Sequence, residues 1–358
     1  MALHRPRRNW GCRVRETHEL GIRTIVLENR TIRLSVLAGK GTDLVEFDYK
    51  PHDLDFVWLA PGGIRNPASM HSTSPDPLAT FLDSYPGGWQ EVFPNAGAPA
   101  FHAGAQYGQH GEVFALPWDV EIIEDAEDAV AVRCTVRGQK TPCVIVKTLR
   151  LSGDEPTLEI RESVTNESPV EIDAMWGHHI TFGSPFLKPG HRIVLPDAVV
   201  AQPHDVAVAP NGRRVANDLA FAWPNGTGAS GAPADFSTIP EPGTPSELFY
   251  LSGFPDATAW YEIVDPETDL GMRVEWDAQT MPYLWYWQEF GATTGYPWYG
   301  RTYTIGLEPS SSYPTNGLPG AVANGSALTL QPGESRRFWL RATVLDRSAV
   351  RTPSAASG

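Results

Sequence analysis

The chain has 358 residues, a length that does not by itself decide between one large domain and two. Its 33 glycines and 32 prolines are scattered along the sequence, which predicts many short elements joined by turns and favours β structure. The net charge of −14, without a basic stripe, argues against nucleic acid and anionic membranes as partners, because both are bound mainly through clustered lysine and arginine.

The chain starts with MALHRPRRNWG, which carries positive charge but no following apolar run. We therefore expect no secretory signal, and no stretch of the sequence is long and apolar enough to predict a membrane span. The three cysteines, Cys12, Cys134 and Cys143, are odd in number and lack metal-ligand spacing. These features predict a protein of the reducing cytoplasm.

Apolar and polar residues alternate in segment after segment, and a period of two is typical of strands with one buried face. Clear cases, in chain order, are residues 32–36, 130–136, 158–164, 272–276 and 338–344. Turn sequences such as LENRT, SGDEP, TNESP and QPGES separate these runs. The best helical signal is DPLATFLDSY, in which Asp76 is the expected N-cap and Pro77 occupies the first helical position.

These patterns predict an all-β protein, built as one large antiparallel β-sandwich with few short helices. We expect the sandwich domain to span residues 20–346, after an N-terminal extension at 1–19 and before a flexible tail at 347–358. A loose loop is expected at residues 224–245, where glycine, proline and serine are frequent.

Four polar, aromatic stretches interrupt the alternation, and each brings histidine, carboxylate or amide groups close to tryptophan. They are SYPGGWQEVFPNAG (84–97), QHGEVFALPW (109–118), MWGHHITFG (175–183), and MPYLWYWQEFG (281–291) with the later GLEPSSSYP (306–314). Sugar rings lie on tryptophan faces, and their hydroxyls need both donors and acceptors. In the last stretch we expect a strand to end at Glu308, so that its carboxylate reaches an open cleft.

Several short motifs occur in an order that resembles the aldose 1-epimerase (galactose mutarotase-like) superfamily over about residues 20–345. They are HG followed by PW, the H-x-x-F segment HITF, LEP, and the C-terminal LTLQPGESRRFWLRATV. GGWQEVFPNAG followed by HGEVFALPW is similar to divergent branches of this superfamily. The resemblance implies a β-supersandwich and an isomerase that interconverts sugar anomers by acid/base ring opening.

The resemblance also implies three catalytic roles. Glu308 removes the proton from the anomeric hydroxyl, His179 protonates the ring oxygen, and His110 binds and polarises the sugar. His178 and His179 point to opposite faces of a strand, so only one of them can face a pocket directly, and the H-x-x-F match selects His179.

Other polar and aromatic residues of the four stretches are candidate substrate contacts. They are Trp89, Gln90, Glu91, Asn95, Glu112, His178, Trp287 and Glu289. Trp89 is the expected sugar platform, because its glycine-rich setting is irregular, and Glu289 is the alternative base. The superfamily's arginine has no counterpart here, since Asn95 stands in its place, and its aspartate has none either, so the mechanism can carry over while the substrate differs.

Two other functions stay open at this point. A non-catalytic carbohydrate-binding or sensing protein is favoured by the missing arginine and aspartate and opposed by the intact acid–base set. A metal-assisted sugar lyase or isomerase would hold a divalent ion at His110, Glu112, His179 and Glu308, a mixed nitrogen and oxygen set without a local signature. We expect no metal and no cofactor; the ligand is a sugar or sugar derivative, and a homodimer is left open.

Overall fold

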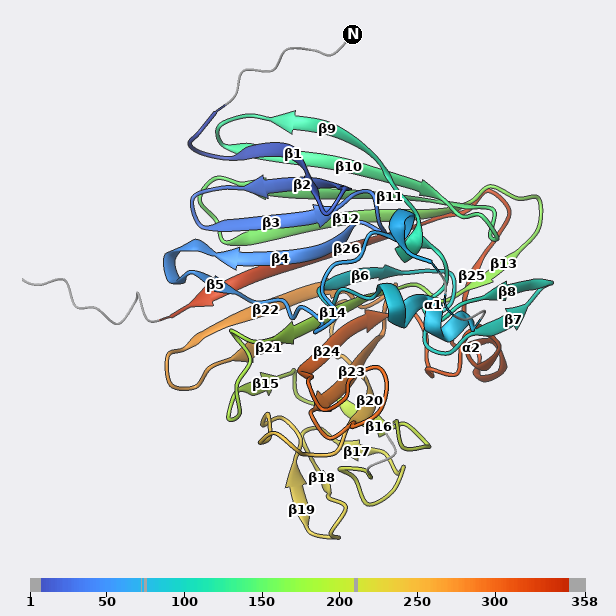
Figure 1. Ribbon diagram of the computed structural model, residues 1–358. Coiled ribbons are helices and arrows are strands. Elements are labelled where there is room, and N and C mark those ends of the chain that lie inside the picture. Colours follow the sequence, from blue (N-terminus) through green and yellow to red (C-terminus); the bar gives the residue numbers. More distant parts are fainter. Residues whose placement is uncertain (1–7, 72, 74–75, 209–211, 348–358) are drawn as a thin grey trace, which may run out of the picture.

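Two large antiparallel sheets form the body of the protein and pack face to face (Figure 1). The computed structural model describes residues 8–71, 73, 76–208 and 212–347. The predicted all-β sandwich with few short helices is confirmed.

The first sheet has 12 strands. Across the sheet they are β1 (Arg13–Glu19), β2 (Ile22–Glu28), β3 (Ile32–Leu37), β4 (Asp43–Tyr49), β6 (Trp89–Val92), β14 (Gly177–Gly183), β24 (Tyr303–Ser310), β23 (Tyr283–Phe290), β20 (Glu247–Ser252), β16 (Val200–Pro203) and β17 (Phe221–Ala222), with β5 (Leu54–Asp55) paired to β4.

The second sheet has 8 strands. In order they are β15 (Arg192–Val194), β21 (Thr258–Val264), β22 (Leu270–Asp277), β26 (Ser335–Asp346), β12 (Thr157–Asn166), β11 (Cys143–Ser152), β10 (Ala129–Arg137) and β9 (Asp119–Asp125).

Small elements complete the described chain. The two-stranded ribbons are β7 (Ala100–His102) with β8 (Ala105–Tyr107), β13 (Ile172–Ala174) with β25 (Leu328–Leu330), and β18 (Asn225–Thr227) with β19 (Pro233–Asp235). The helices are α1 (Pro77–Ser84) and α2 (Leu318–Asn324), and the 3-10 turns are η1 (Lys50–His52), η2 (Pro67–Ser69) and η3 (Val113–Ala115). Neither α1 nor α2 is long and apolar enough to cross a membrane.

The main core lies between the two sheets. The alternating segments predicted from the sequence fall within β3, β10, β12, β22 and β26, and their apolar side chains are buried in this core. In β26, for example, Phe338, Leu340, Ala342 and Val344 are all buried, whereas the residues between them are more exposed. Cys134 lies on the buried face of β10, as expected.

Helix α1 begins where the sequence predicted. The side chain of Asp76 accepts a hydrogen bond of 2.9 Å from the backbone N–H of Leu78, and Pro77 takes the first helical position, where a missing N–H costs nothing. Helix α1 lies next to the centre of the first sheet, beside β6, β14 and β24 (Figure 1).

The register of β6, β14 and β24 positions the candidate site. His178 lies opposite Glu91 and His179 opposite Gln90, while Thr181 lies opposite Gly306 of β24. The sequence predicts that this strand ends at Glu308, and that prediction is wrong. Strand β24 continues to Ser310, and Glu308 pairs with Trp285 of β23. The chain leaves the sheet only after Ser310.

The ends and the long loop differ in detail from the sequence-based boundaries. Strand β1 pairs with β2, so residues 13–19 of the expected N-terminal extension form part of the first sheet. Residues 1–7 and most of the expected tail, 348–358, lie outside the described residues. The expected loose loop at 224–245 contains the β18–β19 ribbon.

Candidate active site

A pocket of about 230 Å³ opens on the face of the first sheet that is turned away from the second sheet. Strands β14, β20, β23 and β24, helix α1 and the loops around them contribute its walls. The described residues that line it are Leu78, Phe81, Leu82, Tyr85, Gln109, His110, His179, Val208, Leu248, Trp285, Trp287, Pro297, Trp298, Glu308 and Thr315.

Three titratable side chains far apart in the sequence meet in this pocket. Nε2 of His179 lies 3.6 Å from Oε1 of Glu308, and the ring centroids of His179 and His110 are 5.1 Å apart. All three residues are buried, with between 5% and 6% of their surface exposed. The structure therefore brings His110, His179 and Glu308 together, the set that the sequence resemblance selected.

Local backbone geometry directs two of these side chains. A Cβ atom on Gly306 would collide with Oε1 of Glu308, so this glycine leaves the space that the Glu308 carboxylate occupies. The backbone N–H of Gly97 donates a hydrogen bond of 3.3 Å to Nδ1 of His110. Because Nδ1 of His110 accepts, the proton of its neutral imidazole sits on Nε2.

Burial shifts the pKa of each group in the direction that favours its neutral form. Burial raises the pKa of Glu308 well above its usual range and lowers the pKa of His179 to about 4. Burial, and to a smaller extent the neighbouring His179, lowers the pKa of His110 well below its usual range. Among the described groups Glu308 has no lysine or arginine within ion-pair distance, so nothing offsets its loss of hydration.

Helix α1 supplies pocket residues that the sequence analysis did not select. The hydroxyl of Tyr85, directly after the helix, lies 3.3 Å from Nδ1 of His179, and its ring packs on Phe81 with centroids 4.9 Å apart. Leu78, Phe81, Leu82 and Tyr85 follow a spacing of three, four and seven residues. That spacing is the sequence signal for one helical face, and it could have identified this wall.

Aromatic residues close the opposite side. Trp287 of β23 lies with its ring centroid 5.9 Å from that of His179 and 5.7 Å from that of Trp298. Trp298 comes from the segment between β23 and β24, which the sequence analysis did not select. Of the eight predicted substrate contacts, the structure places only Trp287 in the pocket lining.

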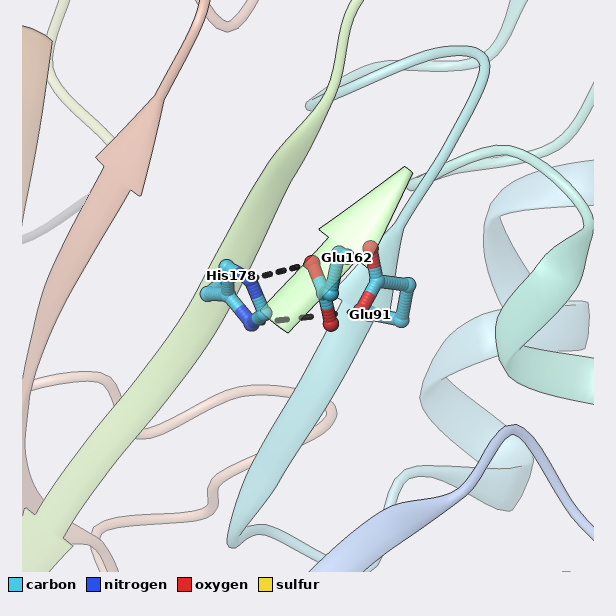
Figure 2. Close-up of side chains that lie close together, drawn as sticks. All are labelled: Glu91, Glu162 and His178. Carbon is cyan, nitrogen blue, oxygen red and sulfur yellow. Dashed lines mark hydrogen bonds and ion pairs between the residues drawn. The ribbon is translucent and has the colours of Figure 1, made fainter. Parts of the chain in front are cut away.

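Trp89, Glu91 and His178 lie on the other face of the first sheet, inside the sandwich. Their expected role as substrate contacts is corrected, because alternation along β6 and β14 turns them towards the second sheet. The indole N–H of Trp89 donates to Nδ1 of His178 over 2.9 Å, and Nε2 of His178 lies 3.0 Å from Glu162 of β12. Figure 2 shows Glu91, Glu162 and His178 turned towards one another.

Lys147 of β11 supplies the positive charge of this interior network. Its Nζ donates to Oε2 of Glu91 over 3.0 Å and lies 3.9 Å from Oε1 of Glu162. Burial lowers the pKa of Lys147, but the carboxylates of Glu91 and Glu162 outweigh it, and the pKa is raised. Lys147 therefore stays charged.

Within the described chain, Glu91, Glu162 and His178 are the group of ligand-type side chains close enough to share a metal ion. Lys147 already balances part of their negative charge, and we assign the network a structural role. The metal set considered from the sequence, His110, Glu112, His179 and Glu308, does not form such a group.

The remaining predicted contacts hold loops rather than face the pocket. Glu112 accepts three backbone N–H bonds, from Gln139, Lys140 and Thr141, at 2.9 to 3.1 Å. These three charge-assisted bonds hold the turn at residues 139–141 against the Glu112 carboxylate. Glu112 is therefore corrected from a substrate contact to a loop anchor.

Asn95, Gln90 and Glu289 are corrected in the same way. Asn95 accepts from the N–H of Leu318 at the start of α2, over 2.7 Å, and donates to two loop carbonyls. Gln90 is fully buried and donates to the carbonyl of Gly87. Glu289, the alternative base, accepts from Ser246, Gly291 and Thr293 and is absent from the pocket lining.

The two packed sheets have the β-sandwich fold of solved galactose mutarotase-like proteins. The chain belongs to the family described as a domain of unknown function (DUF4432), which it matches over residues 19–344. No curated protein matches the chain.

Solved structures share this fold at low sequence identity. A "putative aldose 1-epimerase" from Klebsiella pneumoniae is 20% identical, with a TM-score of 0.73 over 92% of this chain and 81% of that one. Galactose mutarotase-like proteins from Clostridium acetobutylicum and Lactobacillus casei are 16% and 17% identical, with TM-scores of 0.62 and 0.55. They cover 94% and 90% of this chain and 99% of each of theirs. The resemblance drawn from the motifs is thus confirmed for the fold.

The placement of Trp89 leads to a first prediction. Trp89→Ala should destabilise the protein by about 3–5 kcal/mol, because it leaves a cavity in the core and removes the donor to His178. Urea unfolding measures the effect, with Trp10→Ala as the matched control, since Trp10 is 56% exposed. An unchanged unfolding midpoint for Trp89→Ala would contradict a core position.

A second prediction concerns Glu308 and pH. Its folded-state pKa is raised, so the folded protein binds more protons than the unfolded chain above the ordinary carboxyl pKa, and stability falls as pH rises. Glu308→Gln should remove this loss and melt at a higher temperature than the parent at about pH 8, with the difference shrinking towards about pH 4.5.

Thermal unfolding across this pH range measures the difference between the two proteins. Glu267→Gln is the control, because Glu267 is an exposed glutamate outside the pocket. A parent more stable than Glu308→Gln at pH 8 would show instead that the folded protein stabilises the Glu308 carboxylate.

Proposed function

We propose that the protein is an aldose 1-epimerase-like isomerase that interconverts the anomers of a sugar. The observation that carries the proposal is the meeting of Glu308, His179 and His110 in one buried pocket, with 3.6 Å between the carboxylate and the nearer imidazole. Ring opening and closure need one group that gives a proton and one that takes it, both held near the same carbon. The shared fold of mutarotase-like proteins supports the same reaction.

Glu308 and His179 together carry one proton through the cycle. The cycle starts when the shared proton moves from Glu308 to Nε2 of His179, 3.6 Å away. Glu308 then takes the proton of the anomeric hydroxyl as Nε2 of His179 gives one to the ring oxygen. The ring opens, the aldehyde turns about its bond to the next carbon, and the ring closes on the other face with the two transfers reversed. While the sugar is open, Glu308 is a carboxylic acid and His179 a neutral imidazole, the forms that burial favours.

Two neighbours position this pair. Tyr85 lies against Nδ1 of His179, and its oxygen can accept the Nδ1 proton, which leaves Nε2 as the nitrogen that exchanges protons opposite Glu308. His110 stays neutral because its pKa is low, and it presents Nε2–H as a hydrogen-bond donor to the sugar. Trp287 and Trp298 are in the pocket lining, and their indole rings can pack against the C–H surface of the sugar ring.

Kinetics of two variants test the assignment. Glu308→Gln should lower kcat for anomer exchange on the order of 10²-fold or more with little change in KM, because the amide keeps the size of the carboxylate but cannot accept the proton. His179→Asn should behave similarly. Magnetisation-transfer NMR of anomer exchange at several sugar concentrations gives both constants.

Glu267→Gln serves as the control for charge removal, and thermal unfolding excludes misfolded variants. A folded Glu308→Gln protein with the parent's kcat would remove Glu308 from the mechanism. If the parent itself exchanged the anomers of no sugar in a broad panel, the non-catalytic sugar-binding function would replace the isomerase.

The pH dependence of kcat/KM gives an independent check. With one shared proton, the pair is active between the pKa values of the two groups: below about pH 4 His179 is also protonated and no base remains. At the alkaline end Glu308 loses its proton and no acid remains, at a pKa raised by burial. We therefore expect a plateau through about pH 6.5, where an ordinary histidine would titrate, and a step there would contradict the shared-proton pair.

A further inference from the structure

Most of the pocket wall is hydrocarbon, and this limits which sugars can fill it. Leu78 and Leu82 come from α1, Leu248 from β20, and Val208 and Pro297 from the connecting segments. None of these five side chains can donate or accept a hydrogen bond. Phenylalanine and tryptophan rings extend the same apolar surface.

The polar side chains of the lining are few and lie near the acid–base groups. Besides His110, His179 and Glu308, the hydrogen-bonding side chains of the described lining are Gln109, Thr315, Tyr85, Trp285, Trp287 and Trp298. The Tyr85 hydroxyl already meets His179, and the indole N–H of Trp285 already donates to the carbonyl of Ser312. The anomeric hydroxyl and the ring oxygen occupy the three catalytic groups. Few partners are then left for the other hydroxyls of a sugar.

The charge of the lining and the volume of the pocket further restrict which sugars can bind. Glu308 is the one carboxylate in the described lining, which includes no lysine and no arginine, so an anionic sugar would lie beside it without a counter-charge. The volume of about 230 Å³ is below the roughly 300–1,000 Å³ of pockets for drug-sized ligands. One sugar ring is the size that suits it.

We propose that the substrate class is an uncharged monosaccharide that lacks at least one hydroxyl, that is, a deoxy sugar. This inference rests on the proposed anomer exchange in the same pocket. A hydroxyl pressed against an apolar wall loses its hydrogen bonds to water and gains none. Apolar pockets discriminate by up to about 10²-fold against a ligand that adds only a hydroxyl.

Matched pairs of sugars test the substrate class with the parent protein. Anomer exchange is measured for 6-deoxy-D-galactose against D-galactose, 2-deoxy-D-glucose against D-glucose, and 2-deoxy-D-ribose against D-ribose, with D-galacturonate and D-glucose 6-phosphate as charged sugars. We expect kcat/KM for at least one deoxy sugar to exceed that of its parent sugar by about 10- to 100-fold, and the charged sugars to be poor substrates. Equal or better turnover of the fully hydroxylated sugars, or a charged sugar as the best substrate, would overturn the inference.

Two leucine variants test whether the wall causes the preference. Leu78→Gln places an amide in the wall from a helix position that is 38% exposed, and it should reduce the ratio of deoxy to parent sugar. Leu219→Gln is the matched control, at a leucine that is 69% exposed and outside the lining, and should leave the ratio unchanged. An unchanged ratio in folded Leu78→Gln would contradict selection by this wall.

Binding separates this inference from the proposed function. If no sugar is exchanged, the acid–base proposal fails, and saturation-transfer NMR of the same pairs still measures which sugar occupies the pocket. Stronger binding of the deoxy member supports the ligand class, and equal or weaker binding, or none by any sugar, overturns it.

Discussion

Two ion pairs cross the interior of the sandwich, and the position of the pocket depends on them. Glu91 meets Lys147, and His178 meets Glu162, each over 3.0 Å and each between the two sheets. Within each sheet the two charged residues are direct cross-strand neighbours. A slip of β14 by one residue would exchange the faces of His178 and His179, and it would also turn Ile180 and Phe182 out of the core. The network and the apolar face of β14 together therefore fix the register that leaves His179 facing the pocket.

Buried polar groups have charged or hydrogen-bonding partners on the inner face of β14 but few on the pocket face. On the inner face, carboxylates meet lysine, histidine and the indole N–H of Trp176, which donates to Glu91 over 2.5 Å. On the pocket face, Glu308 and His179 are buried without a lysine or an indole N–H of the described chain beside them. Burial therefore raises the pKa of Glu308 and lowers that of His179, and both shifts favour the neutral forms. Buried titratable groups with strongly shifted pKa values cluster at functional sites, because proteins retain this cost where chemistry requires it.

The pocket walls come from parts of the chain that are distant in sequence but held together by specific contacts. The hydroxyl of Tyr296 donates to Asp83 of α1 over 2.9 Å, which joins the segment carrying Trp298 to the helix carrying Phe81. The ring of Trp58 lies 5.7 Å from that of Trp298 and 5.9 Å from that of Tyr85, measured between centroids. One aromatic cluster therefore supports both sides of the cavity and shapes its apolar interior.

Local patterns in the sequence were enough to predict the strands, the start of α1 and the overall class of fold. Period-two alternation indicates a strand with one buried face, and an Asp–Pro pair indicates the start of a helix. Both signals can be recognised in the sequence because they depend on residues close together in the chain. The ordered motifs selected His110, His179 and Glu308 as a set, and the three meet as that selection required.

Tertiary structure alone decided which remaining side chains face the pocket. Trp89, Glu91 and His178 sit on central strands covered on both faces, and alternation cannot say which covered face is the core and which the pocket. Glu112 found its partners in a turn far along the chain, between β10 and β11. The spacing of Phe81 and Tyr85 indicates one face of α1, but only the packing of that face against His179 of β14 shows that it lines the pocket.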